Sequence, residues 1–275
     1  MVNAKDDIIN WGDYMDLVYH YTSINTLALI LKNRTIRLNC LKNVDDMDEG
    51  LVDGFGNLSD YFFASSWTED GMENIALWNM YAPNMTGVRI GLPCDMLNLT
   101  YDEDHFITNG LVYGSDSDKE ILIKMFGASL PQPVVYDSEG MKRQLFSYKS
   151  GSKENLEINS KYLGLAKNNQ WEFQQESRFR VLAIPKNHIC CNMRYKPDVN
   201  ACLALIVKEP FSIDYIDLPL KNEALKKMEI MLGPNCIDSD KIVVESLVRN
   251  LLNSKNIKIE KSQLKIRQRY NSSWQ

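Results

Sequence analysis

Several features are scarce in this 275-residue sequence, and each absence excludes a class of protein. No apolar run approaches the roughly 20 residues of a membrane-spanning helix, so no membrane partner is expected. The first ten residues are polar and lack the apolar segment of a secretory signal, which predicts a cytoplasmic protein. Because 31 Lys and Arg oppose 36 Asp and Glu, the chain as a whole has no basic field that would attract nucleic acid.

Nucleotide-binding and metal-binding motifs are also missing. No G-x-G-x-x-G follows a strand and no G-x-x-x-x-G-K-[ST] occurs, which argues against Rossmann and P-loop folds. The six cysteines form no C-x-x-C pair and are expected to be reduced thiols. A zinc site at His188, Cys190 and Cys191 is the alternative, but zinc ligands are usually spaced more widely. No metal is therefore expected.

The N-terminal part of the chain has patterns typical of a strand, a helix and a second strand. Residues 17–22 predict a short strand, and Ser23 follows where a helix N-cap belongs. One face of the predicted helix carries Ile24, Leu27, Ala28 and Leu31. Asn33 is expected to end this helix in the left-handed conformation, and residues 35–39 resume a strand pattern.

The remaining elements are irregularly ordered. Strands are predicted at 61–67, 87–92, from 177 onward, at 203–207 and at 228–232, and helices at 73–81, before Pro83, and after an N-cap at Ser239. Residues 114–160 are expected to hold long surface helices and loops, and one interpretation makes them a mobile lid or insertion. Because strands and helices do not alternate regularly, the fold class is α+β. Without a repeat or a clear linker, residues 1–275 are expected to form a single domain.

Gln174 and Glu176 form the first pair that could carry chemistry. They lie two positions apart at the start of a predicted strand, and alternate residues of a strand point to the same side. A carboxylate can stabilise positive charge that develops on a ribose, while an amide can orient an acceptor group. The structural alternative is a surface ion pair of Glu176 with Arg178 or Arg180, which spacing alone favours.

Two aromatic-rich segments supply further candidates. His20 lies between tyrosines at a predicted strand end, where a neutral imidazole offers one donor and one acceptor. Tyr81 ends a predicted helix and could stack on a flat heterocycle. The structural alternatives are a satisfied, half-buried histidine and core packing of Tyr81 with Trp78, three positions before it.

Two charged segments have two interpretations each. The acidic stretch could bind a divalent cation, as a nuclease would need, but it lacks the spacing of a calcium loop and is better explained as a solvated loop. Its carboxylates are Asp45, Asp46, Asp48 and Glu49. The tail at 255–275 is basic and could follow a phosphate backbone or form an edge strand protected by lysines. Its cations are Lys255, Lys258, Lys261, Lys265, Arg267 and Arg269, against Glu260 alone.

Taken in order, these segments resemble the bacterial domain of unknown function 2971, whose members look distantly like ADP-ribosyltransferases. The matching segments are Tyr19–Ser23, Asn43–Glu49, Phe63–Ser66, Leu77–Ala82, Gly87–Gly91, Trp171–Arg178, Leu232–Pro234, and Ser262 with Arg267. Two departures stand out: Gln174 replaces a frequent glutamate, and Met47 replaces a frequent proline. In ADP-ribosyltransferases a Gln-x-Glu pair is associated with acceptors other than arginine.

The resemblance implies an ADP-ribosyltransferase-like fold, in which two β-sheets split around an NAD cleft and helices surround them. It implies that His20, beside Tyr21 and Thr22, holds the adenine-side ribose of NAD, with Ser65 or Ser66 in support. Tyr81 would stack on the nicotinamide. Glu176 would be the catalytic carboxylate, and Gln174 would position the acceptor.

The first functional hypothesis is therefore an NAD-dependent mono-ADP-ribosyltransferase. The basic tail favours a nucleic-acid acceptor, RNA first. The resemblance implies a toxin of antiviral defence, which would need a neutralising antitoxin partner. The alternatives are a non-catalytic binding module with the same fold, a protein-directed ADP-ribosyltransferase, and a magnesium-dependent nuclease that uses the acidic loop.

Overall fold

The computed structural model describes residues 17–52, 56–137, 146–149, 155–158, 163–186, 212–253 and 257–266. Several features predicted above lie outside these residues. They are the zinc alternative at His188, Cys190 and Cys191, the strand at 203–207, and the tail residues Lys255, Arg267 and Arg269.

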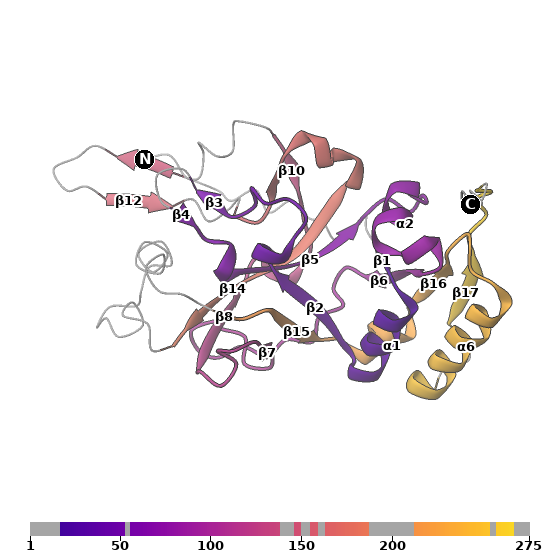
Figure 1. The fold of residues 1–275 in the computed structure, drawn as a ribbon. Coiled ribbons are helices and arrows are strands. Elements are labelled where there is room, and N and C mark those ends of the chain that lie inside the picture. Colours follow the sequence, from indigo (N-terminus) through magenta and orange to yellow (C-terminus); the bar gives the residue numbers. More distant parts are fainter. Residues whose placement is uncertain are drawn as a thin grey trace, which may run out of the picture.

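The described chain combines many strands with a few helices, as the predicted α+β class requires (Figure 1). The α-helices are α1 (Ile24–Asn33), α2 (Ile75–Tyr81), α5 (Asn222–Lys226) and α6 (Asp238–Leu252). The short 3-10 helices are η2 (Leu41–Asn43), η3 (Ser59–Tyr61), η4 (Pro83–Met85), η5 (Gly127–Ser129) and η6 (Asn169–Gln174). The strands are β1 (Leu17–Thr22), β2 (Thr35–Cys40), β3 (Leu51–Val52), β4 (Gly56–Asn57), β5 (Phe62–Thr68), β6 (Val88–Pro93), β7 (Leu111–Tyr113), β8 (Ile121–Met125), β9 (Gln132–Pro133), β10 (Val135–Tyr136), β11 (Phe146–Lys149), β12 (Asn155–Ile158), β13 (Ala166–Lys167), β14 (Glu176–Pro185), β15 (Tyr215–Pro219), β16 (Glu229–Leu232) and β17 (Lys258–Lys261).

In the part of the chain that the structure describes, one mixed sheet of 11 strands dominates the fold. Its order is β17-β16-β6-β1-β5-β2-β15-β7, and β14 pairs with β5, β8 and β9. The β16–β17 pair is parallel, whereas β1, β5, β6, β14, β2 and β15 pair antiparallel. The sheet therefore joins strands from both the N-terminal and the C-terminal parts of the described chain.

The sheet divides along one edge of β5. β14 pairs with β5 from Thr68 back to Phe62, so it occupies one edge of that strand. The other edge is shared: β1 pairs only at Thr68, and β2 pairs only at Phe63 and Ala64. Since β1 and β2 hold opposite ends of this edge, residues 65–67 between them have no strand partner there. This divergence of β1 from β2 creates the space for a site.

Local sequence explains most helix and strand boundaries. The Ser23 hydroxyl accepts a hydrogen bond from the Thr26 amide at 3.0 Å, which confirms the predicted N-cap of α1. The left-handed residue that follows α1 is Arg34 (φ 55°) rather than Asn33, because the helix runs one residue longer than predicted. Ser239 is not the N-cap of α6 either: the helix begins at Asp238, and the Asp240 carboxylate accepts from the Ile237 amide at 2.8 Å.

The core lies between the sheet and its helices. Val18, Leu38, Phe63, Ile90 and Phe179, from five different strands, are fully buried in one cluster. Helix α1 lies beside α6, at the side of the molecule where β16 and β17 lie (Figure 1). Burying side chains of this size stabilises the fold by about 1.5–3 kcal/mol each.

The prediction of long helices at 114–160 is wrong for the described part of this region. Strands β8, β9 and β10 lie there, together with β11 and β12, which pair with each other. Strands β8, β9 and β10 are short and mostly half-buried or exposed, so their sequences have no strong period-2 pattern. The described residues of 114–160 include no α-helix. Nothing tests the lid interpretation, because residues 138–145, 150–154 and 159–162 lie outside the described residues.

Two further predictions concern the tail and the membrane. The described part of the tail contains β17, which pairs with β16 at the end of the sheet, as the edge-strand interpretation expects. Lys258 on this strand lies 3.1 Å from Glu260, so part of its charge is balanced locally. Among the described residues, no helix is long and apolar enough to cross a membrane.

Candidate functional site

A cavity of about 420 Å³ lies where β1 and β2 diverge, a volume within the range of small-molecule sites. Its walls come from β1, β2, β5, α1, α2, η6 and β14. All of the site residues predicted from the sequence line it: His20, Tyr21, Thr22, Ser65, Ser66, Tyr81, Gln174 and Glu176. The fold thus brings together residues from the start, the first third and the middle of the chain. Their individual roles stay predictions.

His20 lies on β1, beside the stretch of β5 that has no strand partner on this edge. Its Nδ1 donates to the Ser66 carbonyl at 2.8 Å, and its ring lies 5.1 Å from that of Trp67. A carbonyl oxygen can only accept, so Nδ1 carries the proton. Burial lowers the pKa of His20 below its usual 6.5, although the hydrogen bond to Ser66 opposes this shift. At neutral pH the ring is therefore uncharged, and Nε2 is a hydrogen-bond acceptor.

The other β1 and β5 candidates are held by local contacts. The Tyr21 hydroxyl accepts from the Asn74 amide at 2.9 Å, and its ring meets Trp78 edge to face. Tyr21 thereby fixes the start of α2. The Ser65 hydroxyl accepts from Trp67 Nε1 at 3.0 Å and is buried, so its contact is structural. Ser66 is less buried, and it contributes a side-chain hydrogen bond to Glu176.

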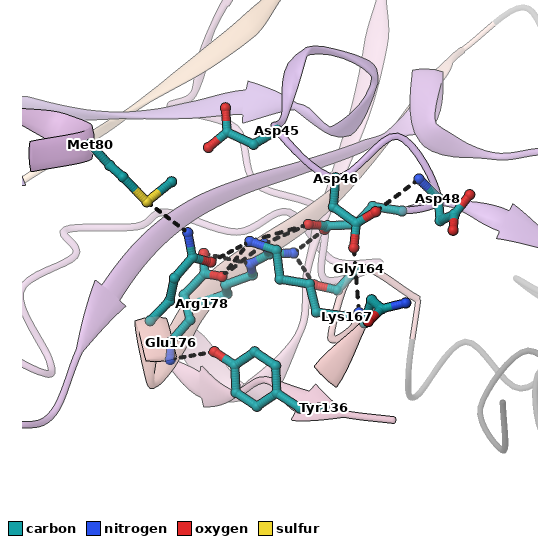
Figure 2. Close-up of polar contacts among 12 residues, drawn as sticks. Asp45, Asp46, Asp48, Met80, Tyr136, Gly164, Lys167, Glu176 and Arg178 are labelled. Carbon is teal, nitrogen blue, oxygen red and sulfur yellow. Dashed lines mark hydrogen bonds and ion pairs between the residues drawn. The ribbon is translucent and has the colours of Figure 1, made fainter. Parts of the chain in front are cut away.

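Glu176 belongs to a buried cluster of four charges, two acids and two bases (Figure 2). Arg178 Nε and Nη2 each donate to Glu176 at 3.0 Å, and Lys167 Nζ lies 3.0 Å from Glu176 Oε2. The same guanidinium donates to both oxygens of Glu49, and Lys167 lies 3.5 Å from Glu49. The structural alternative of a Glu176–Arg178 ion pair is therefore present, but it is buried rather than on the surface.

The charges of this cluster sum to zero, which allows it to be buried. Burial alone would raise the pKa of Glu176, but the charges of Arg178 and Lys167, with hydrogen bonds from Arg178 and Ser66, lower it to about 2. Glu176 and Glu49 raise the pKa of Arg178, against the effect of its burial. Glu176 is therefore ionised at every physiological pH.

Gln174 reaches the cluster by a different backbone path from the one predicted. It ends η6, and Gln175 then takes a left-handed conformation (φ 45°, ψ 55°) before β14 begins at Glu176. The extended backbone expected at 174–176 is therefore wrong. The two side chains still converge, because Lys167 Nζ donates to Gln174 Oε1 at 2.7 Å as well as to Glu176.

Tyr81 and Trp78 have different surroundings, although both lie on α2. Trp78 is fully buried, and its indole donates to Glu73 at 3.0 Å, so core packing explains this residue. Tyr81 is 36% exposed and lines the cavity. Its hydroxyl accepts from Gln174 Nε2 at 2.8 Å and lies 3.3 Å from Asp45 Oδ2. Burial, followed by the charges of Glu176 and Asp45, raises the pKa of this hydroxyl, so it stays protonated.

The acidic loop does not act as one unit. Asp46 accepts from the backbone amides of Asp48 and Asn168, at 3.0 and 3.4 Å, and closes the loop. Glu49 points to Arg178, while Asp45 points to Tyr81. Within the described residues, no group of three His, Cys, Asp or Glu side chains could hold a metal ion. The magnesium-dependent nuclease stays a hypothesis.

Sequence reasoning missed Lys167, and it assigned Glu49 to a loop in solvent. Both are buried: their side chains are 3% and 1% exposed. A lysine in a polar stretch has no local signal of burial, and only the tertiary structure brings it to Glu176. Glu49 did have a signal, since it ends the acidic turn that contributed to the family resemblance.

Residues 77–179 match the model of a family described as "Protein of unknown function (DUF2971)", so this segment is similar to that family. The matched segment includes Tyr81, Gln174 and Glu176, but not His20. No curated protein and no solved structure gives a significant match to the chain.

Proposed function

We propose that this protein is an NAD-dependent mono-ADP-ribosyltransferase with NAD bound in the cavity between β1 and β2. One observation carries the proposal: His20, Tyr81 and Glu176, which lie far apart in the sequence, line a single cavity. The division of the sheet along β5 is also what an ADP-ribosyltransferase-like fold, with split sheets around a dinucleotide, would need.

The cavity offers groups that match parts of NAD. Neutral His20 presents Nε2 as an acceptor for a ribose hydroxyl, and Tyr81 presents an aromatic ring to the nicotinamide. Leu29 and Ile30 of α1 contribute apolar side chains to the wall of the cavity. Glu176 stays ionised and could stabilise positive charge on the ribose as the bond to nicotinamide breaks.

A nucleic acid, RNA first, is the proposed acceptor. Lys258, Lys261 and Lys265 follow one another on and after the edge strand β17, and cations in such a row can contact successive phosphates. In this proposal the enzyme is a cytoplasmic defence toxin, and a partner antitoxin restrains it.

Labelled NAD tests the activity. Purified protein is incubated with total RNA and with cell extract, NAD carrying its label on the adenylate portion, and label is counted in nuclease-sensitive and protease-sensitive fractions. Released nicotinamide is measured in parallel. Glu176→Gln should abolish transfer, whereas Glu103→Gln, at an exposed turn position, should not change it. Thermal unfolding of each variant shows that it is folded.

The outcomes separate the hypotheses. Label in the nuclease-sensitive fraction supports a nucleic-acid acceptor, and label in the protease-sensitive fraction supports the protein-directed transferase. Transfer that survives Glu176→Gln removes Glu176 from the mechanism. If the wild-type protein neither releases nicotinamide nor labels any fraction, the transferase proposal is wrong.

One observation favours a second candidate, a non-catalytic module that binds a nucleotide. Both oxygens of Glu176 already accept hydrogen bonds, from Arg178 and Lys167, as they would in a purely structural ion pair. This candidate predicts saturable NAD binding in calorimetry without nicotinamide release, and identical affinity for a non-hydrolysable NAD analogue.

A further inference from the structure

A directional chain of hydrogen bonds runs from the buried charge cluster to the cavity. Lys167 has only donors, so it fixes Gln174 with Oε1 toward the ammonium. Gln174 Nε2 then donates to the Tyr81 hydroxyl at 2.8 Å. Because the Tyr81 oxygen receives this bond, its own proton is free to point at Asp45 Oδ2, 3.3 Å away. Each donor in this chain of hydrogen bonds is thus turned toward the next acceptor, and the carboxylate of Asp45 is the last acceptor.

Asp45 is the carboxylate on the cavity wall that no described cation neutralises. The three carboxylates of the wall are Asp45, Glu176 and Asp217. Glu176 is paired with Arg178 and Lys167, and Asp217 accepts two bonds from Arg37, at 3.0 and 3.1 Å. Asp45 has only the long bond from Tyr81 among the described contacts, and it is exposed. In Figure 2 it lies apart from the ion-paired side chains.

Gln174, the residue expected to position the acceptor, is already occupied. It is 2% exposed, and its amide contacts Lys167, Tyr81 and the sulfur of Met80, 3.9 Å from Nε2. A group this buried could reach an acceptor only by breaking several contacts. Asp45 stands at the open end of the same chain and has free lone pairs.

We infer that Asp45 is the general base of the transfer, and that it takes the proton of the acceptor nucleophile. This inference rests on the proposed function. In the step, the bond between the ribose C1′ and the nicotinamide nitrogen of NAD breaks, and its electron pair stays on the departing, neutral nicotinamide. A lone pair of the acceptor oxygen or nitrogen forms the new bond to C1′. The proton of that atom passes to the Asp45 carboxylate, which later releases it to water.

The two carboxylates then have separate tasks. Glu176 is a fixed negative charge, because Arg178 and Lys167 keep its pKa at about 2 and make it a poor proton acceptor. Asp45 is an exposed carboxylate whose described hydrogen bond comes from the neutral Tyr81 hydroxyl, so no described cation competes for its lone pairs. Gln174 and Tyr81 act as positioning residues, since they hold the hydroxyl that orients Asp45.

Rescue by a small acid tests this assignment. Asp45→Ala is compared with Asp48→Asn, a change at an exposed position of the same loop that does not line the cavity. Transfer of labelled ADP-ribose, nicotinamide release and NAD affinity by calorimetry are measured for each, with and without sodium formate. Asp45→Ala should lower transfer about 100-fold or more, the range that one general base contributes, with NAD affinity kept within about threefold. Formate should restore transfer in Asp45→Ala and have no effect on the wild-type protein or on Asp48→Asn.

Each of the following outcomes would overturn the inference. Transfer at the wild-type rate in Asp45→Ala overturns the inference while leaving the transferase intact. A loss that formate does not restore also overturns it, because it makes Asp45 a positioning residue. If the wild-type protein shows neither transfer nor nicotinamide release, the proposed function fails, and the inference fails with it.

Discussion

The guanidinium of Arg178 donates to both carboxylate oxygens of Glu49, although 129 positions separate the two residues in the sequence. Their side chains are each 1% exposed. This pair ties the acidic loop to the first residues of β14, so the loop that carries Asp45 is held against the strand that carries Glu176. The ion pair therefore has a structural effect on both walls of the cavity.

Arg178→Met should destabilise the protein by about 3–5 kcal/mol, because it leaves two buried carboxylates with Lys167 as their only cation. The free energy of unfolding is measured by urea titration. Lys221→Met is the matched control: its partner Asp95 lies 2.9 Å away, but both side chains are well exposed, and the cost should stay within about 1 kcal/mol. Equal costs for the two substitutions would contradict the burial of the cluster.

Glu176 should make the free energy of unfolding depend on pH in the acid range. Its pKa falls from the usual 4.5 to about 2 in the folded state, so the unfolded chain binds the proton more readily. The stabilisation is complete above pH 4.5 and is lost as pH falls toward 2, by roughly 3 kcal/mol in total. Urea titrations between pH 2 and pH 6 measure it. Glu176→Gln should flatten this dependence, and an unchanged acid slope in that variant would count against the cluster.

His20 should titrate below its usual pKa of 6.5, because burial disfavours the imidazolium. The chain has three histidines, and the missing imidazole resonance in the spectrum of His20→Gln identifies His20. Since the folded-state pKa is lowered, the neutral ring stabilises the fold above pH 6.5, and this contribution declines as pH falls through the folded-state value. An NMR titration that places the His20 pKa above 6.5 would contradict this effect of burial.

Gly87→Ala should destabilise the protein by about 1–3 kcal/mol through overpacking. A Cβ at Gly87 would clash with the backbone carbonyl of Thr22 and lie 2.7 Å from Ala82 Cβ, and neither group can move without displacing β1 or α2. Gly71→Ala is the control, since its nearest neighbours are side-chain atoms of Tyr19 at 3.8 Å, and it should change stability by less than about 0.5 kcal/mol. The melting temperatures of the two variants compare them directly. Similar melting temperatures for the two variants would mean that β1 and α2 tolerate displacement.

Local patterns alone were enough to predict β1, α1, β2, β5, α2, β14, β16 and α6, because each depends on periodicity, caps and breakers within a short window. They also identified His20, Tyr81, Gln174 and Glu176 as candidates. The short strands at 121–136 and the left-handed turn at Gln175 were beyond such patterns, since half-buried strands have weak periodicity and glutamine gives no signal of that conformation.

The environment of each candidate depended on the fold. Whether Glu176 is free or ion-paired is decided by the register of β14 on β5 and by the position of Lys167, and no local window contains that information. The same holds for Asp45, whose charge stands out only because Glu49 and Glu176 are neutralised by Arg178 and Lys167. Charge balance is a property of neighbours in space, so the tertiary structure determines it.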